Sequence, residues 1–337
     1  RAQTRQRAAA ILKERYTNGG READLVRVLE VELEAVKSAK DRARRHEQIA
    51  VLHETLGGTG DALEHVVQLV LLEPHVKEHR DRLEELAGKV SAYPRLADVL
   101  VAAADKADDD ALRAELCLHA GKVAAGPLHD DERAIELFSR VLLGPNAQDE
   151  VVLAACRCTE PLLEKARRAP EHLDVLERQA SLEQDPEVRF AVLAKAARLA
   201  TELFELDRAI WAWESCRDID PTDAEAVDGL VGLFERTKRG KELVGVLRAR
   251  AKLEGRPREA RRSDRVRIAD ILGETLGEVE EAIAAWDEEE REFGESDENV
   301  RARLSLYRAS RQWEKLASLL ERAAERPGSN EVSAAYL

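Results

Sequence analysis

The segment DRAIWAWESCRDIDP, from Asp207 to Pro221, decides the fold of this 337-residue chain, because related segments occur three more times. They are DALEHVVQLVLLEP, which ends at Pro74, ERAIELFSRVLLGP, which ends at Pro145, and EEAIAAWDEEEREFG, which ends at Gly294. Each carries apolar residues at three- and four-residue steps, a spacing typical of one face of an amphipathic helix. A proline or glycine then gives a helix stop signal. The sequence therefore predicts the same helix four times.

These segments recur at a fixed period. Aligned on Ala62, Ala134, Ala209 and Ala282, they lie 72, 75 and 73 residues apart. Five related segments alternate with them at intervals of 71 to 76 residues, and their anchors are Leu25, Leu96, His172, Leu243 and Leu316. The period is thus about 73 residues and divides into two similar halves. Self-similarity on this scale indicates a solenoid of stacked repeats.

Each half of the period predicts two helices joined by a short turn. In one half, EVRFAVLAKAARLATELF precedes DRAIWAWESCRDI, and both have helical apolar spacing. Asp61 and Asp207 are predicted N-caps, and Pro74, Pro145 and Pro221 are predicted helix stops. The stretches GGTG (57–60) and TNGG (17–20) are predicted turns. The chain then holds about nine helix pairs and the start of a tenth, without strand-like alternation.

The second helix of each pair carries a recognisable spacing. Ala209 is followed by Trp213 four residues later, Cys216 seven later and Pro221 twelve later. This pattern resembles the tetratricopeptide repeat family, whose motif places a small, an aromatic, a small and a proline residue at these steps. The segment at Ala62 keeps the spacing with aliphatic residues, and other segments match it in part. The W-x2-L-G-x2-Y signature of the family's first helix is largely missing.

The resemblance implies an all-α, right-handed superhelix (an α-solenoid) of about nine stacked hairpins, with a groove lined by first helices. We expect a single solenoid over 1–337 with units of roughly 1–74, 75–145, 146–221, 222–296 and a partial 297–337. The chain begins at Arg1 without a methionine and inside a helical pattern, so we expect it to be truncated at both ends. The expected function is a non-enzymatic scaffold that binds a partner helix or peptide.

Composition excludes several other classes of protein. The net charge of −14 argues against nucleic-acid binding, which needs a basic surface. No apolar run approaches the 18 residues of a membrane span, and no signal peptide is visible. The Ala-, Arg- and Leu-rich, methionine-free composition suggests a bacterial genome of high GC content.

The cysteines give an indication of the cellular location. Cys117, Cys156, Cys158 and Cys216 all lie in predicted helices, and we expect buried, reduced thiols. Reduced thiols favour the cytoplasm. A periplasmic location stays open because of the missing N-terminus.

No catalytic constellation, cofactor site or metal site is predicted. GGTG lacks the Lys-Ser/Thr that a phosphate-binding P-loop requires. His75 and His79 lie one helical turn apart, but the sequence supplies no third metal ligand, so we expect a solvated helix face. Trp211 and Trp213 are predicted to be packing residues rather than ligand contacts.

The tetratricopeptide family often binds carboxylate-ending peptide tails through a lysine and an asparagine four residues apart on first helices. None of the corresponding pairs has that composition, so such a clamp is not expected. The pairs are Ala194/Arg198, Asp228/Gly232, Arg267/Ile271 and Arg301/Ser305.

The charges of the fourth unit are segregated by sign. Residues 236–267 contain 13 Lys/Arg against 4 Asp/Glu, whereas 270–298 contain 13 Asp/Glu against one Arg. Adjoining helices could neutralise each other, or the charges could form a docking surface that includes a longer linker, RPREARRSDR (256–265). Neutralisation does not require segregation, because interleaved charges would neutralise a helix stack equally well. We therefore predict that the segregated charges form a docking surface. The candidate partner-binding residues are Arg198, Glu202, Glu225, Asp228, Glu235, Arg261, Arg262, Asp264, Arg265, Arg267, Glu274, Arg301 and Arg308. In the family register, eight of them fall on the groove side of first helices: Glu225, Asp228, Glu235, Asp264, Arg267, Glu274, Arg301 and Arg308.

Two other interpretations stay open beside a protein-binding scaffold in a larger assembly. The repeats could be the regulatory region of an enzyme or signalling protein whose catalytic domain lies outside this sequence. AIWAWES also loosely resembles the half-a-tetratricopeptide motif of RNA-processing scaffolds, although the acidic balance counts against direct RNA contact.

Overall fold

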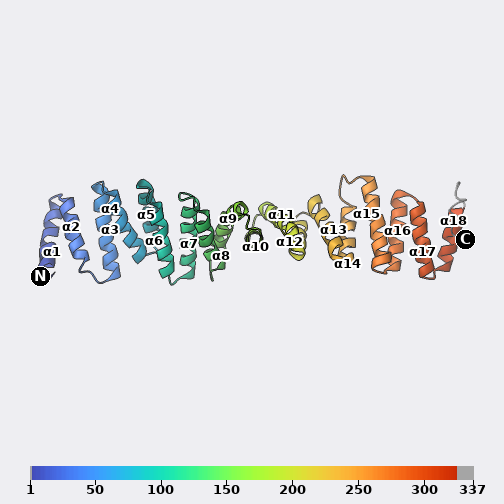
Figure 1. Ribbon diagram of the computed structural model, residues 1–337, viewed down its shortest axis with the longest axis horizontal. Coiled ribbons are helices and arrows are strands. Elements are labelled where there is room, and N and C mark those ends of the chain that lie inside the picture. Colours follow the sequence, from blue (N-terminus) through green and yellow to red (C-terminus); the bar gives the residue numbers. More distant parts are fainter. Residues whose placement is uncertain (1, 325–337) are drawn as a thin grey trace. The chain divides into compact units, whose positions relative to one another are not determined.

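The computed structural model describes residues 2–324, which form α-helices, one short π-helix (η1) and no strand (Figure 1). The first helices of the hairpins are α1 (Ala2–Asn18), α3 (Ala39–Thr55), α5 (Lys77–Lys89), α7 (Asp110–Ala125), α9 (Asp149–Ala166), α11 (Pro186–Glu202), α13 (Ala224–Thr237), α15 (Arg258–Asp270) and α17 (Asp297–Ala309). The second helices are α2 (Glu22–Leu33), α4 (Thr59–Leu72), α6 (Tyr93–Lys106), α8 (Asp131–Leu143), α10 (Ala169–Leu182), α12 (Leu206–Ile219), α14 (Gly240–Arg250), α16 (Val279–Phe293) and α18 (Trp313–Ala324). The predicted helical hairpins are confirmed; the start of a tenth pair lies outside the described residues.

The hairpins fall into two compact units. The first unit holds α1–α10 and ends at Leu182, and the second begins at Glu183 and holds α11–α18. Within each unit, every hairpin packs on its neighbours in the chain. An all-α stack of hairpins is therefore confirmed in both units. That the two continue as one right-handed superhelix stays a prediction.

Small residues and aromatic rings fit together in the cores of both units. Ala209 and Trp213 are buried in the second unit, where the indole ring lies against Gly229 of α13; a Cβ on that glycine would be 2.8 Å from the indole nitrogen. In the first unit, a Cβ on Gly121 of α7 would lie 2.5 Å from the ring of Phe138 in α8. These close approaches give the interdigitated packing of a protein interior.

Trp211 was expected to pack, and that prediction was wrong. Its side chain is 43% exposed, whereas Trp213 is 4% exposed. Residues two apart point to nearly opposite sides of an α-helix, since each residue turns the chain by about 100°. With Trp213 in the core, Trp211 must face outward.

Helix ends agree with the predicted stop signals better than with the predicted caps. Pro74, Pro145 and Pro221 each follow the end of a helix by two residues, as expected. Asp61 and Asp207 are not N-caps, because α4 begins at Thr59 and α12 at Leu206. Both carboxylates lie in the first helical turn instead, where they interact favourably with the helix dipole.

The predicted loops are shorter than expected. In GGTG only Gly57 and Gly58 form the turn, and the φ of +78° at Gly57 is a conformation that glycine adopts without strain. Similarly, RPREARRSDR is not a long linker. Only Arg256 and Pro257 precede α15, because the remaining residues already belong to that helix. Strong helix formers such as Arg, Glu and Ala explain the early start.

Three ion pairs and one histidine–carboxylate hydrogen bond connect corresponding helices of successive hairpins in the first unit. Arg80 and Glu84 of α5 pair with Glu115 and His119 of α7, at 3.4 and 3.0 Å. Asp98 and Asp105 of α6 pair with Arg133 and Arg140 of α8, at 2.7 and 2.5 Å. The partners in all four pairs are 35 residues apart in sequence. This interval is one hairpin, half of the 73-residue period.

Candidate interaction surface

A cavity of about 460 Å³ opens among α13, α14, α15 and η1 of the second unit. Its floor is apolar, since Phe234 and Leu243 are buried and Ile271 is half-buried. Its rim is charged and polar. The full lining is Phe234, Glu235, Lys238, Gly240, Leu243, Arg267, Asp270, Ile271, Glu274 and Thr275. A concave site with an apolar floor and a few charged groups is a typical binding pocket.

One wall of this cavity is a break in regular helical geometry. At Asp270 the helix α15 gives way to η1 (Ile271–Thr275), whose wider turn is closed by a hydrogen bond from the Leu276 N–H to the Ile271 carbonyl at 2.9 Å. The segment approaches its neighbours closely, because a Cβ on Gly273 would lie 3.2 Å from Leu306. Single π-helical turns are frequent at functional sites.

The charges around the cavity are incompletely balanced. Arg267 of α15 forms an ion pair with Glu235 of α13. Asp270 and Glu274 form no ion pair among the described residues. Burial raises the pKa of Asp270, and the negative charge of Glu274 raises it further. With Lys238 also on the rim, the lining carries three carboxylates against two cations. The cavity is therefore suited to a cationic group.

Three of the predicted partner-binding residues meet at this cavity: Glu235, Arg267 and Glu274. Others lie outside it on the same set of first helices. Arg198 of α11 donates two hydrogen bonds to Glu225 of α13, each 2.6 Å long.

The remaining predicted residues on exposed positions are not gathered at the cavity. Asp228 pairs with Arg250 at 3.0 Å. Glu202, Arg301 and Arg308 are exposed.

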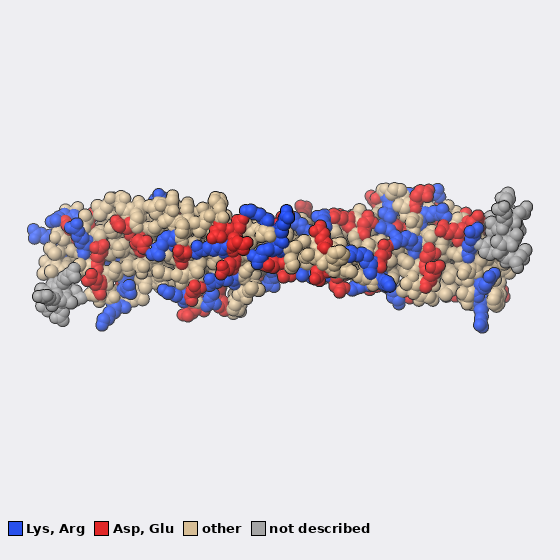
Figure 2. Space-filling model, in the orientation of Figure 1, with Lys and Arg blue, Asp and Glu red and all other residues tan. Residues whose placement is uncertain are grey.

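The three arginines Arg261, Arg262 and Arg265 face the next helix instead of an open groove. Their closest carboxylates on α16 are those of Glu292 at 2.9 Å, Glu289 at 2.8 Å and Glu288 at 2.7 Å. Figure 2 shows basic and acidic side chains interleaved over this part of the surface. Segregation by sign in the sequence thus places opposite charges on the two facing helices of one hairpin. This geometry favours neutralisation over docking for these arginines.

Asp264 was predicted on the groove side of α15, and that placement was wrong. The residue is 1% exposed and its carboxylate accepts hydrogen bonds from Arg250 at 2.5 Å and from Arg256 at 2.7 Å. It fastens the end of α14 and the following loop to α15. A buried carboxylate must be paired, and here two guanidinium groups do so.

The predicted histidine pair is also placed differently. α5 begins at Lys77, so His75 precedes the helix and shares no helix face with His79. The Nε2 atom of His79 lies 3.3 Å from Glu73. A different group, Glu30, His53 and His65, brings potential metal-ligand atoms within 4.8 Å of one another.

Sequence reasoning missed Asp270 and the apolar floor of the cavity. The apolar periodicity of α15 continues into ILGET (271–275), so it gave no sign of a π-helical turn there. It also missed Glu30, His53 and His65, because these lie on three helices and form no local motif. Among the described residues, no helix combines the length and the apolar character needed to cross a membrane.

Comparison with known proteins adds only distant structural similarity. No protein family matches the sequence, and no curated protein is similar to it. Among solved structures, the TPR2AB domain of yeast Sti1 in complex with pHSP90 is 14% identical, with 80% of this chain and 98% of that chain covered at a TM-score of 0.33. PilF of Pseudomonas aeruginosa is 18% identical, with coverages of 67% and 97% and a TM-score of 0.31. A tetratricopeptide repeat protein from Parabacteroides merdae is 13% identical, with coverages of 78% and 98% and a TM-score of 0.31. At these TM-scores the fold rests on the hairpins of this chain alone.

Proposed function

We propose that this chain is a protein-interaction scaffold whose second unit holds a partner peptide or helix along its first helices. The observation that supports this most is the cavity among α13, α14, α15 and η1, where Asp270 and Glu274 lack ion-pair partners among the described residues. A lysine or arginine of the partner would lay its aliphatic stem on Phe234 and Leu243 and its charged head between the two carboxylates.

The residues around the cavity would then contact the flanking parts of the partner. Glu202, Arg301 and Arg308 are exposed and carry charges that could select a partner by its charge pattern. The pairs Arg198–Glu225 and Glu235–Arg267 would keep neighbouring first helices in register beneath it. The composition further suggests a bacterial multiprotein assembly as the setting. Regulation of an attached enzyme would use the same surface.

The test is a peptide selection followed by a charge reversal. Wild-type protein is panned against a displayed peptide library, and the selected peptides are synthesised and measured by fluorescence anisotropy. We expect them to be enriched in lysine and arginine. The double variant Asp270→Lys/Glu274→Lys should bind them at least about tenfold more weakly, because two attractive charge contacts of up to about 1 kcal/mol each are replaced by repulsive ones.

The matched control is the double variant Glu242→Lys/Glu254→Lys, which makes the same change of net charge at two exposed positions outside the cavity. It should bind within about twofold of wild type, since exposed charges are screened over roughly 8 Å at physiological salt. An equal loss of affinity in both variants would show that binding depends on net charge alone. Undiminished binding by the folded Asp270→Lys/Glu274→Lys variant would disprove the proposal.

Binding should also depend on pH in a defined direction. Only the ionised carboxylate of Asp270 attracts a cation, and burial raises its pKa. Affinity should therefore fall on acidification at a higher pH than an ordinary aspartate would give. In Asp270→Asn we expect weaker binding at neutral pH and a flatter pH profile. If the affinity of the wild type stayed constant until the pH reached the pKa of an ordinary aspartate, this role of Asp270 would be contradicted.

A further inference from the structure

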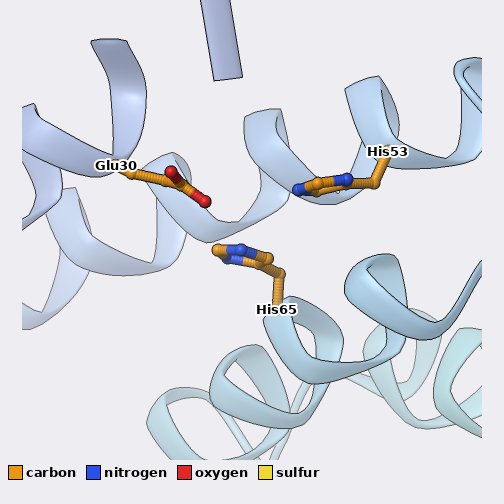
Figure 3. A group of neighbouring side chains, drawn as sticks. All are labelled: Glu30, His53 and His65. Carbon is orange, nitrogen blue, oxygen red and sulfur yellow. The ribbon is translucent and has the colours of Figure 1, made fainter. Parts of the chain in front are cut away.

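A group of histidines lies at the other end of the chain, in the first unit. His53 is in the last turn of α3, His65 is in α4, and Glu30 reaches towards them from α2 (Figure 3). One potential ligand atom from each residue lies within 4.8 Å of the others. Both histidines are half-buried, whereas Glu30 is exposed. The three helices belong to two successive hairpins.

The orientation of His53 leaves one ring nitrogen available to this group. Its Nδ1 atom lies 3.8 Å from the carboxylate of Asp61. Figure 3 shows the outer edge of the His53 ring directed towards Glu30 and His65. The two groups are not hydrogen-bonded at this distance, but a small rotation of the exposed Asp61 side chain would bring its carboxylate within reach, and a carboxylate in that place is the usual partner of a metal-bound histidine.

His65 forms a hydrogen bond with His46. Its Nδ1 atom lies 3.1 Å from the Nδ1 atom of His46, so one of the two nitrogens must carry the proton of this hydrogen bond. The ring of His65 is stacked on that of His53, with the centroids 5.6 Å apart. When His65 is the donor, its other ring nitrogen keeps a free lone pair.

We propose that Glu30, His53 and His65 form a site for one divalent transition-metal ion, with zinc as the expected ion. Two imidazole nitrogens and one carboxylate are a three-ligand set that zinc takes, with a fourth position left for water. Ligand atoms around a tetrahedral zinc ion lie about 3.4 Å apart, given bonds of about 2.0–2.1 Å. The ligand atoms lie within 4.8 Å of one another, and small rotations of the exposed Glu30 side chain and of the two imidazole rings would bring them to this spacing. The ion would fasten α2 to the hairpin of α3 and α4.

The experiment uses the whole 337-residue chain, freed of metal by chelator and then titrated with Co(II). Tetrahedral Co(II) gives intense visible absorption, which Zn(II) removes by competition. We expect one equivalent to bind, and the melting temperature to rise with metal because the ion binds only the folded state. The variants His53→Gln, His65→Gln and Glu30→Gln should each bind more weakly, the two histidine variants by at least a hundredfold.

Two further variants separate a built site from general histidine binding. His119→Gln removes a histidine of α7 that pairs with Glu84, and it should bind Co(II) as wild type does. Asp61→Asn should weaken binding by about 10- to 100-fold through the loss of the carboxylate behind His53. Glu30→Gln changes an exposed residue and keeps the test valid even if His65→Gln does not fold. Wild-type affinity in Glu30→Gln and His53→Gln, or an octahedral spectrum in wild type, would overturn the proposal.

Discussion

Single buried residues in this chain carry roles that their neighbours cannot replace. Asp264 is enclosed at the junction of α14 and α15 and pairs with Arg250 and Arg256, whose side chains are themselves largely buried. Removing one partner of a buried ion pair leaves the other charge uncompensated, which costs more than the pair itself contributes. The carboxylate of Asp264 therefore matters more for stability than its small size suggests.

We expect Asp264→Asn to lower the free energy of unfolding by about 3 kcal/mol, because two guanidinium groups lose their common partner. Urea denaturation followed by circular dichroism measures this change. The control is Glu254→Gln, which removes a negative charge from an exposed position of the adjoining loop. A loss as small as that of the control would show that water or Asp228 compensates Arg250.

The cysteines give a second prediction at the scale of single residues. Burial raises the pKa of Cys156 to about 11 and that of Cys216 to about 12. Because the thiolate is the reactive form, these thiols should react very slowly at pH 8. Cys158 is only half-buried. A thiol-reactive dye should therefore label one fast site in native protein and four after unfolding.

Cys158→Ser should remove the fast phase of that reaction. Labelling of Cys156 or Cys216 at the rate of Cys158, read by peptide mass spectrometry, would contradict the prediction.

At the scale of helices, the sequence predicts what depends on local pattern. The hairpins follow from apolar steps of three and four residues, and Pro74 and Pro221 end their helices as expected. Contacts between helices cannot be predicted from local pattern. Nothing local shows that Arg262 meets Glu289, because this contact depends on how α15 and α16 face each other. The cavity and the histidine group arise in the same way, so neither could be predicted from spacing.

Helix crossings in the first unit give a prediction at this scale. A Cβ on Gly121 of α7 would lie 2.5 Å from the ring of Phe138, which is fully buried. Gly121→Ala should therefore destabilise the protein by about 1–3 kcal/mol through overpacking. Gly60→Ala is the matched control, since a Cβ at Gly60 of α4 meets nothing within 4 Å. It should be neutral or stabilise the helix by up to about 1 kcal/mol.

Thermal unfolding of the two variants measures the difference. If both alanines had the same effect, close packing at Gly121 would not be the cause.

Within each unit, stability should be distributed hairpin by hairpin, because the described helices pack mainly on those of their own and the adjacent hairpins. Ala209 is fully buried at a helix crossing of the second unit. Ala209→Leu should cost about 1–3 kcal/mol by overpacking. Hydrogen exchange should then rise over residues 185–255 and stay unchanged near Leu25. A uniform rise over both units would contradict nearest-neighbour coupling.

The ion pairs between corresponding helices of the first unit have a consequence for assembly. Hairpins of similar shape expose similar apolar faces, so hydrophobic packing alone does not specify which hairpin should meet which. Among the described residues, Arg80, Asp98 and Asp105 form their ion pairs with the hairpin that follows their own. A hairpin stacked out of turn, or borrowed from a second molecule at another position, would bring unmatched charges together. Charge complementarity thus favours the native order of the hairpins over other orders while the chain folds.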